Sequence, residues 1–132
     1  MTLHTIPPYI YAGLQRYHQE SFMTRRVGFS SSDEQIIYVV ANQFGVSVND
    51  IMSASRMRLF TEARHFAIYF IRKYTNKTLE QIGILLNRNH STILYAIGVA
   101  EDLMQTNWDY KQSAEKIENK IKELAGEFSQ SE

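Results

Sequence analysis

The sequence contains no cysteine, has only two prolines, both near the N-terminus, and has no long uninterrupted apolar run. Without cysteine, neither a disulfide framework nor a cysteine-based zinc site can form. A membrane-spanning helix needs about 20 consecutive apolar residues, so none is expected. The first residues also lack the charged-then-apolar layout of a signal peptide. These absences predict a cytoplasmic protein.

A net charge of one sign is also missing, because 14 basic residues balance 14 acidic residues in the 132-residue chain. The balance is not local. Residues 56–95 carry seven basic and two acidic side chains, whereas residues 31–55 and 96–132 are acidic overall. A neutral total can therefore hide one positive surface.

Helix signals divide most of the chain after residue 31, while residues 1–30 form an arm whose Pro7 and Pro8 favour an extended path. We expect helices at about 33–44, 47–52, 58–74, 78–86, 90–105 and 110–126. No pattern of period two indicates a strand, so the predicted fold class is all-α, a compact multi-helix domain. The expected inward faces include Ile36, Val39, Val40 and Phe44; Leu59, Ala63, Phe66, Ala67, Phe70 and Ile71; Leu79, Ile82, Leu85 and Leu86; Ile93, Ile97, Ala100, Leu103 and Met104; and Ile117, Ile121 and Leu124. Trp108 and Tyr110 are expected in a connector, packed in the core.

The segment NRNHSTILYAI, residues 87–97, crowds polar side chains into the start of a helix. A short helix, a tight turn and a longer helix form the helix-turn-helix layout, in which the second helix enters the DNA major groove. Asn, Ser and Thr side chains can contact base edges, and a helix N-terminus favours phosphate. The same residues are also common helix caps in proteins that touch no DNA, so the pattern alone leaves both interpretations open.

A longer match favours DNA binding. The segments EARHFAIYF, YTNKTLEQIG and NRNHSTILYA resemble, in order and spacing, the C-terminal DNA-binding domain of the bacterial replication initiator DnaA. The resemblance covers about residues 33–125. It implies a helix-turn-helix that contacts a short DNA box, with a preceding basic loop at DIMSASRMR near the adjacent minor groove.

The resemblance also implies roles for individual residues, each carried over from a matching position. The base-contacting group comprises Arg88, Asn89, His90, Ser91 and Thr92. The basic loop contributes Arg56 and Arg58, and the positions at or near phosphate are Arg64, Lys77 and Thr78. Arg56 and Arg58 could instead be solvent-exposed charges at a helix start. For Arg72 and Lys73, which lie near a helix C-terminus, the favoured interpretation is that they stabilise the end of that helix.

The sequence departs from the family pattern at three places in the motif. Asn89 stands where the family usually has Asp, and Asn can also pair with adenine. Tyr95 replaces the usual His, and the turn is one residue shorter than the common form with two glycines. Ala54 and Ser55 leave the basic loop lean, which predicts fewer phosphate contacts and a shallower salt dependence.

No G-x-x-x-x-G-K-[ST] phosphate loop is present, so we expect no nucleotide, no cofactor and no enzymatic activity, and a free-standing domain without the family's ATPase domain. The four histidines lack metal-ligand spacing, and no acid is placed to orient His90 and Ser91 as a catalytic pair. The expected layout is an arm at 1–30, a DNA-binding domain at 31–127 and a tail at 128–132. The expected partner is double-stranded DNA, the expected location is the nucleoid, and the process is replication or its regulation.

A second hypothesis remains open. The chain could be a protein-interaction module that kept the fold and lost DNA affinity. The apolar arm would then provide a partner or homodimer contact.

Overall fold

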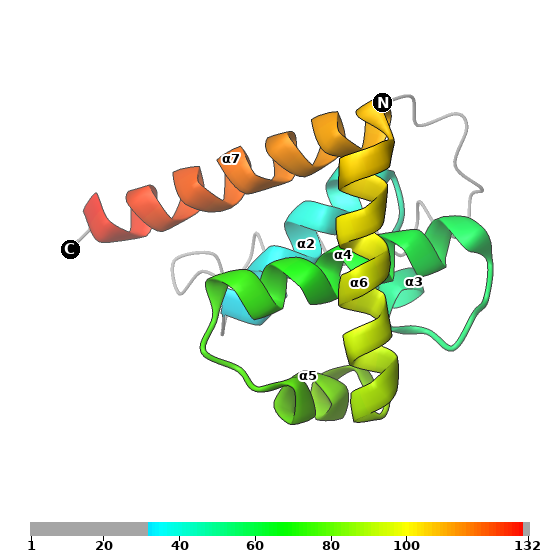
Figure 1. Ribbon diagram of the computed structural model, residues 1–132. Coiled ribbons are helices and arrows are strands. Elements are labelled where there is room, and N and C mark those ends of the chain that lie inside the picture. The colour runs from blue at the N-terminus through cyan, green and yellow to red at the C-terminus, as the bar shows by residue number, and fades with distance from the viewer. Residues whose placement is uncertain (1–31, 131–132) are drawn as a thin grey trace.

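The computed structural model of the protein describes residues 32–130, and side chains as far as Ala125. The expected arm at 1–30 and its homodimer contact lie outside the described residues. Figure 1 shows the helices: α2 (Ser32–Phe44), α3 (Val48–Met52), α4 (Arg58–Tyr74), α5 (Leu79–Leu86), α6 (His90–Thr106) and α7 (Trp108–Gln130). No strand occurs between residues 32 and 130, so the all-α prediction is confirmed. Over the same span, no helix is both long and apolar enough to cross a membrane.

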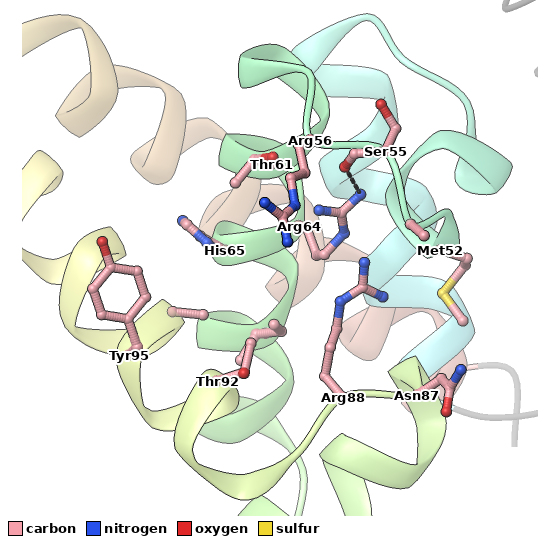
Figure 2. A pocket seen from close by; sticks show the side chains of 13 residues that line it. Met52, Ser55, Arg56, Thr61, Arg64, His65, Asn87, Arg88, Thr92 and Tyr95 are labelled. Atoms are coloured by element: carbon pink, nitrogen blue, oxygen red, sulfur yellow. Dashed lines mark hydrogen bonds between the residues drawn. The ribbon is translucent and has the colours of Figure 1, made fainter.

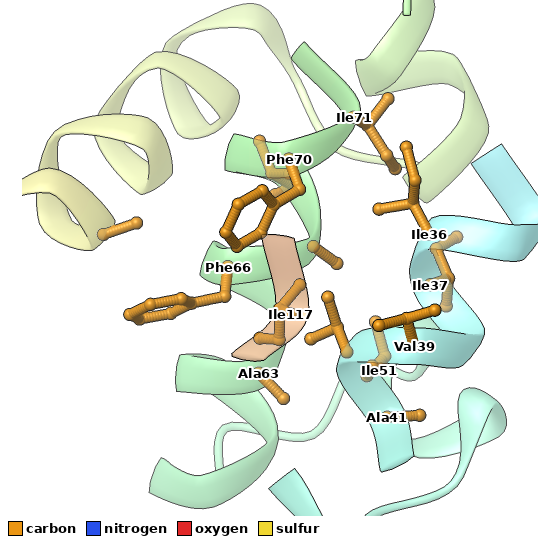
Figure 3. Packing of buried hydrophobic residues seen from close by; sticks show 14 of the residues in the cluster. Ile36, Ile37, Val39, Ala41, Ile51, Ala63, Phe66, Phe70, Ile71 and Ile117 are labelled. Carbon is orange, nitrogen blue, oxygen red and sulfur yellow. The ribbon is translucent and has the colours of Figure 1, made fainter. Parts of the chain in front are cut away.

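Helix α4 lies at the centre of the fold, because it packs against α2, α3, α5 and α6. Its apolar residues recur on the helical period, so one broad face can be buried. Phe66, Phe70 and Ile71 from that face meet Ile36 from α2 and Ile117 from α7 (Figure 3), and all five side chains are almost fully buried. This core holds α4 and α6 in place, and these two helices position the loops near residues 53–57 and 87–89.

Helix α7 covers α2 and α6 and starts at the far end of α6 from His90 (Figure 1). The α6 helix is 17 residues long, which corresponds to roughly 25 Å. Glu118 of α7 accepts a hydrogen bond from Lys73 Nζ at 2.7 Å and another from the Tyr74 hydroxyl. The ion pair raises the pKa of Lys73 and lowers that of Glu118, while burial raises the pKa of Tyr74 to about 12. The acidic last helix is therefore held away from the start of α6.

The first helix of the helix-turn-helix, α5, begins at a capping box. Thr78 Oγ1 accepts the Gln81 N–H at 3.1 Å, and Gln81 Oε1 accepts the Thr78 N–H at 2.9 Å. These bonds satisfy two backbone groups that a helix start otherwise leaves without partners. In the sequence, Thr78 and Gln81 stand three residues apart, which is the spacing of a capping box, and the structure forms that box.

The turn after α5 reverses the chain without a glycine of its own. Asn87 takes the left-handed conformation (φ 56°, ψ 48°), which Asn tolerates better than most residues. The Arg88 N–H donates to the Gly83 carbonyl at 2.8 Å. A Cβ on Gly83 would lie 2.4 Å from the Arg88 carbonyl oxygen, so the turn can close only because residue 83 has no side chain.

Two expectations about packing are wrong. Leu59 is 42% exposed, and its neighbour Phe60 is buried instead. Helix α4 starts at Arg58, and a single apolar residue near a helix start does not determine how the helix is rotated about its own axis. Trp108 is 68% exposed and starts α7, since only Asn107 separates that helix from α6. Tyr110 also belongs to α7 and is half-buried, with its ring stacked on Phe66 at 5.9 Å.

Candidate nucleic-acid interface

A cleft separates the loop after α3 from the helix-turn-helix (Figure 2). We call it the loop–helix cleft; its volume is about 840 Å³. It is bounded by the loop at residues 52–56, by one face of α4, by the turn between α5 and α6, and by the first turns of α6. Its lining residues are Met52, Ala54, Ser55, Arg56, Thr61, Arg64, His65, Ile68, Asn87, Arg88, Thr92, Tyr95 and Ala96. The cleft lies between the basic loop and the helix-turn-helix, the two regions for which DNA contact was expected from the sequence.

Arg64 forms the inner wall of the loop–helix cleft. Its Nε donates to the Ile51 carbonyl at 2.7 Å, and its Nη2 donates to the carbonyls of Asp50 and Ser55, both at 3.2 Å. The residue is only 5% exposed. The planar guanidinium thus donates to three carbonyls of α3 and the following loop, of which only that of Asp50 also accepts a backbone N–H, from Ser53. This geometry gives Arg64 a structural role in shaping the loop, and its phosphate role stays a prediction.

Arg88 connects the helix-turn-helix to the same loop. Its Nη1 donates to the Leu86 carbonyl at 2.7 Å, and its Nη2 donates to the Ser53 carbonyl at 2.6 Å across 35 positions of sequence. The side chain is half-buried. Arg88 therefore fixes the spacing between the loop and the start of α6, while its base contact stays a prediction.

The loop–helix cleft is electropositive. Burial, followed by the nearby charge of Arg88, lowers the pKa of Arg64 to about 10, and burial also lowers the pKa of Arg88. Both side chains remain cationic at neutral pH, so two like charges are held close together. None of the 13 lining residues is acidic. An anionic partner would therefore relieve a repulsion that the fold itself leaves uncompensated.

Histidine 65 lies on α4 beside Arg64 and also lines the cleft. Burial lowers its pKa, and the charge of Arg64 lowers it further. Its Nδ1 is buried and has no hydrogen-bond partner within the described residues. The ring stands edge-on to Tyr95 of α6, with the ring centroids 6.1 Å apart.

The first residues of α6 are arranged as a cap with an exposed polar edge. Asn89 Oδ1 accepts the Thr92 N–H at 2.8 Å, which makes Asn89 the N-cap. His90, Ser91 and Thr92 are exposed, and no side-chain hydrogen bond occupies them within residues 32–125. Thr92 alone of these four lines the cleft, so the other three lie at the outer tip of the helix.

The two basic residues of the loop differ. Arg56 is exposed at the mouth of the loop–helix cleft (Figure 2), and it makes no ion pair within the described residues. Arg58 lies outside the cleft and pairs with Glu62 one turn later, at 2.9 Å. That hydrogen bond raises the pKa of Arg58. Arg56 is the more available of the two for a partner.

Lys77 and Thr78 are not brought to the cleft. The Lys77 Nζ lies 3.3 Å from a carboxylate oxygen of Asp33, which is itself buried. The Thr78 hydroxyl is engaged in capping α5. Their phosphate roles stay predictions, at a position beside α5 instead of the cleft.

Tyr95 lines the loop–helix cleft together with Thr92, although no role was expected for it from the sequence. Tyr95 is 67% exposed and lies one helical turn beyond Ser91 and Thr92. Residues three and four apart share a helix face, so this spacing was the available signal. On the described part of the chain, no three His, Asp or Glu side chains lie close enough together to hold a metal ion.

Comparison with known proteins gives one consistent family. Residues 34–99 match the sequence profile described as the bacterial dnaA protein helix-turn-helix. That match contains the loop, α4, α5 and most of α6. All parts of the loop–helix cleft lie within it.

Curated relatives agree with the profile. The chain is 33% identical over 93 residues to the chromosomal replication initiator protein DnaA of Crocosphaera subtropica, covering 70% of this chain and 20% of the relative. It is 36% identical over 93 residues to that of Desulfatibacillum aliphaticivorans, with the same coverage. For Onion yellows phytoplasma the identity is 35% over 88 residues, covering 67% of this chain and 17% of the relative. The chain thus spans about a fifth of the length of these relatives.

Proposed function

Because the chain belongs to the bacterial DnaA helix-turn-helix family, we propose that it binds double-stranded DNA in a sequence-specific manner. In this proposal α6 enters the major groove, and the loop at residues 53–57 lies near the adjacent minor groove. The chain acts as a non-catalytic DNA-binding domain in replication initiation or its regulation, in the nucleoid. It needs no nucleotide for this step.

The observation that carries the proposal is the exposed polar edge at the start of α6. A helix that uses Asn89 to cap its own N-terminus keeps His90, Ser91 and Thr92 available to a partner. Donors, acceptors and a Thr methyl can together distinguish base pairs in the major groove. Residues at this position of the second helix meet base edges in helix-turn-helix proteins.

The loop–helix cleft supports the proposal through its charge. The DNA backbone carries one negative charge about every 1.7 Å of helix axis, and basic side chains bind it by releasing counterions. Arg56 at the mouth of the cleft can approach the narrow minor groove, while Arg64 and Arg88 hold the loop and strengthen the local positive potential. Lys77 and Thr78 would approach phosphate beside α5.

The proposed DNA binding is tested by fluorescence anisotropy with two duplexes, one carrying a DnaA-type box and one with the same composition scrambled. Tighter binding of the box supports the proposal. Equal affinity for the two duplexes at every salt concentration removes the sequence-specific part of it. If neither duplex binds even at low salt, the proposal of DNA binding is wrong.

A specific observation favours the second hypothesis, a protein-interaction module. Ile84 and Leu94 of the helix-turn-helix are 78% and 55% exposed, which leaves apolar area on the region assigned to DNA. If the titrations show no DNA binding and light scattering shows a dimer, this hypothesis replaces the first one. In the DNA-binding proposal, the DNA-binding domain spans residues 31–127, and the arm at 1–30 can supply a homodimer contact.

A further inference from the structure

The two polar ends of the Asn89 side chain are engaged differently. Its Oδ1 accepts the Thr92 N–H at 2.8 Å. A backbone N–H can donate only to an acceptor, so the oxygen must be the inner atom and the amino group, Nδ2, the outer one. Asn89 is exposed, and Nδ2 makes no hydrogen bond within the described residues.

The position of Nδ2 places it in the proposed base-contacting edge. Asn89 immediately precedes His90 and Ser91, the outermost residues of α6. Its backbone is extended (φ −82°, ψ 167°), and the cap bond closes its side chain back over the first turn. The carboxamide therefore cannot rotate to exchange its two ends without losing the helix cap, which would cost roughly 1 kcal/mol.

Hydrogen-bond chemistry then decides what Nδ2 can contact. In the major groove, guanine offers the acceptors N7 and O6, thymine offers O4 and adenine offers N7, whereas cytosine offers only an amino donor. The two-bond pairing of Asn with adenine needs both Oδ1 and Nδ2. The sequence left that pairing open. The cap occupies one of the two lone pairs of Oδ1 and directs this oxygen toward the first turn of α6, so Nδ2 is the polar group of Asn89 that has no partner within the described residues.

We propose that Asn89 determines specificity as a hydrogen-bond donor through Nδ2, which favours a base with a major-groove acceptor and disfavours cytosine at the position it contacts. The inference rests on the proposed DNA binding and adds to it the base that this position excludes. It also separates the two functions of the side chain, with the oxygen stabilising α6 and the amino group contacting DNA.

The matched variant is Asn89→Asp, because Asp and Asn are about equally good N-caps. Asp keeps an oxygen for the Thr92 N–H and replaces the outward amino donor with a carboxylate acceptor. The acceptor should favour cytosine or adenine, whose amino groups donate in the major groove. Added negative charge will lower the affinity for all DNA, so the readout is relative base preference and not total affinity.

The experiment is selection of bound duplexes from a randomised pool, carried out with the wild type and Asn89→Asp in parallel. We expect cytosine to be depleted at one position with the wild type and to rise there by about tenfold or more with Asn89→Asp, while the other positions stay the same. Asn89→Ser, which keeps a capping hydroxyl that can both donate and accept, should make that one position degenerate. Circular dichroism melts establish that all three proteins fold.

The outcomes distinguish the inference from the function beneath it. If the wild type selects no sequence, the proposed sequence-specific binding fails and the inference fails with it. If the wild type selects a sequence and Asn89→Asp selects the same base at every position, DNA binding stands and the inference is overturned. A wild-type preference for cytosine at the position that changes also overturns it.

Discussion

Two regions of the same positive surface use their polar side chains in opposite ways. At the inner wall of the loop–helix cleft, Arg64 and Arg88 donate five hydrogen bonds to backbone carbonyls, and both are at least half-buried. At its mouth and along the tip of α6, Arg56, His90 and Thr92 are exposed, and their side chains make no such bonds to the described part of the chain. The difference shows that the inner arginines shape the site, whereas the outer residues are left for a partner.

Replacement of Arg64 should have the largest effect, and it tests whether the inner arginines have a structural role. Arg64→Ala removes three hydrogen bonds, leaves the Ile51 and Ser55 carbonyls without a donor, and should lower the free energy of unfolding by about 3 kcal/mol, measured by urea titration. Arg64→Lys keeps the charge but not the planar fork, so it should also destabilise. Arg58→Ala is the matched control and should change stability little, since the Arg58 side chain is exposed and Glu62 keeps its hydrogen bond from the Tyr110 hydroxyl. Unchanged stability with loss of DNA binding in Arg64→Ala would mean that Arg64 contacts DNA directly.

The turn that carries the outer residues can be tested through two glycines of the same helix-turn-helix. Gly83→Ala puts a Cβ 2.4 Å from the Arg88 carbonyl oxygen, so the backbone must shift, and we expect a loss of about 2 kcal/mol in unfolding free energy. Gly98→Ala is the control, because nothing lies within 4 Å of its Cβ and α6 should gain about 0.5–1 kcal/mol. Equal effects from the two substitutions would show that the turn does not need the close approach at residue 83.

The outer residues should affect DNA and leave the fold unchanged. His90→Ala or Thr92→Ala should reduce the discrimination between box and scrambled duplexes by about 1 kcal/mol, measured by anisotropy. Neither change removes the cap, because Asn89 accepts from the Thr92 backbone N–H. Urea midpoints should therefore match the wild type. A fall in stability as large as that of Arg64→Ala would place these residues with the inner set.

The smallest expected effect concerns His65, which is half-buried beside Arg64. Because burial lowers its pKa in the folded state, His65 stays neutral there while the unfolded chain takes up a proton near pH 6.5. Its contribution to stability is therefore present above about pH 6.5 and is lost as the pH falls through the lowered folded pKa. His65→Gln should lose less stability than the wild type between pH 7 and pH 5, measured by urea titration at each pH. An identical pH dependence in the two proteins would contradict the pKa shift.

The sequence contained most of the fold, because helix caps and apolar spacing are local. Thr78 and Gln81 marked the start of α5 correctly, and the buried faces of α2 and α6 followed the helical period. Leu59 and Trp108 could not be placed from local pattern, because their exposure depends on how α4 starts and on how closely α7 follows α6.

The candidate site was less predictable than the fold. The motif located its residues, but a sequence does not show where a long side chain ends. Arg88 crosses to Ser53, and Arg64 is satisfied by carbonyls between nine and 14 positions earlier in the chain. Such contacts depend on tertiary structure, as does the neighbouring position of His65 and Tyr95 on different helices.

The most direct test of the proposed interface is a titration of the ¹⁵N-labelled chain with the box duplex, followed by amide chemical shifts. The account predicts that the largest changes will fall on residues 53–57 and on Asn89–Tyr95, with α7 nearly unchanged. The same titration with the scrambled duplex should give smaller changes at Asn89–Tyr95. Changes centred on α7, or equal changes at the start of α6 for both duplexes, would contradict sequence-specific binding through this surface.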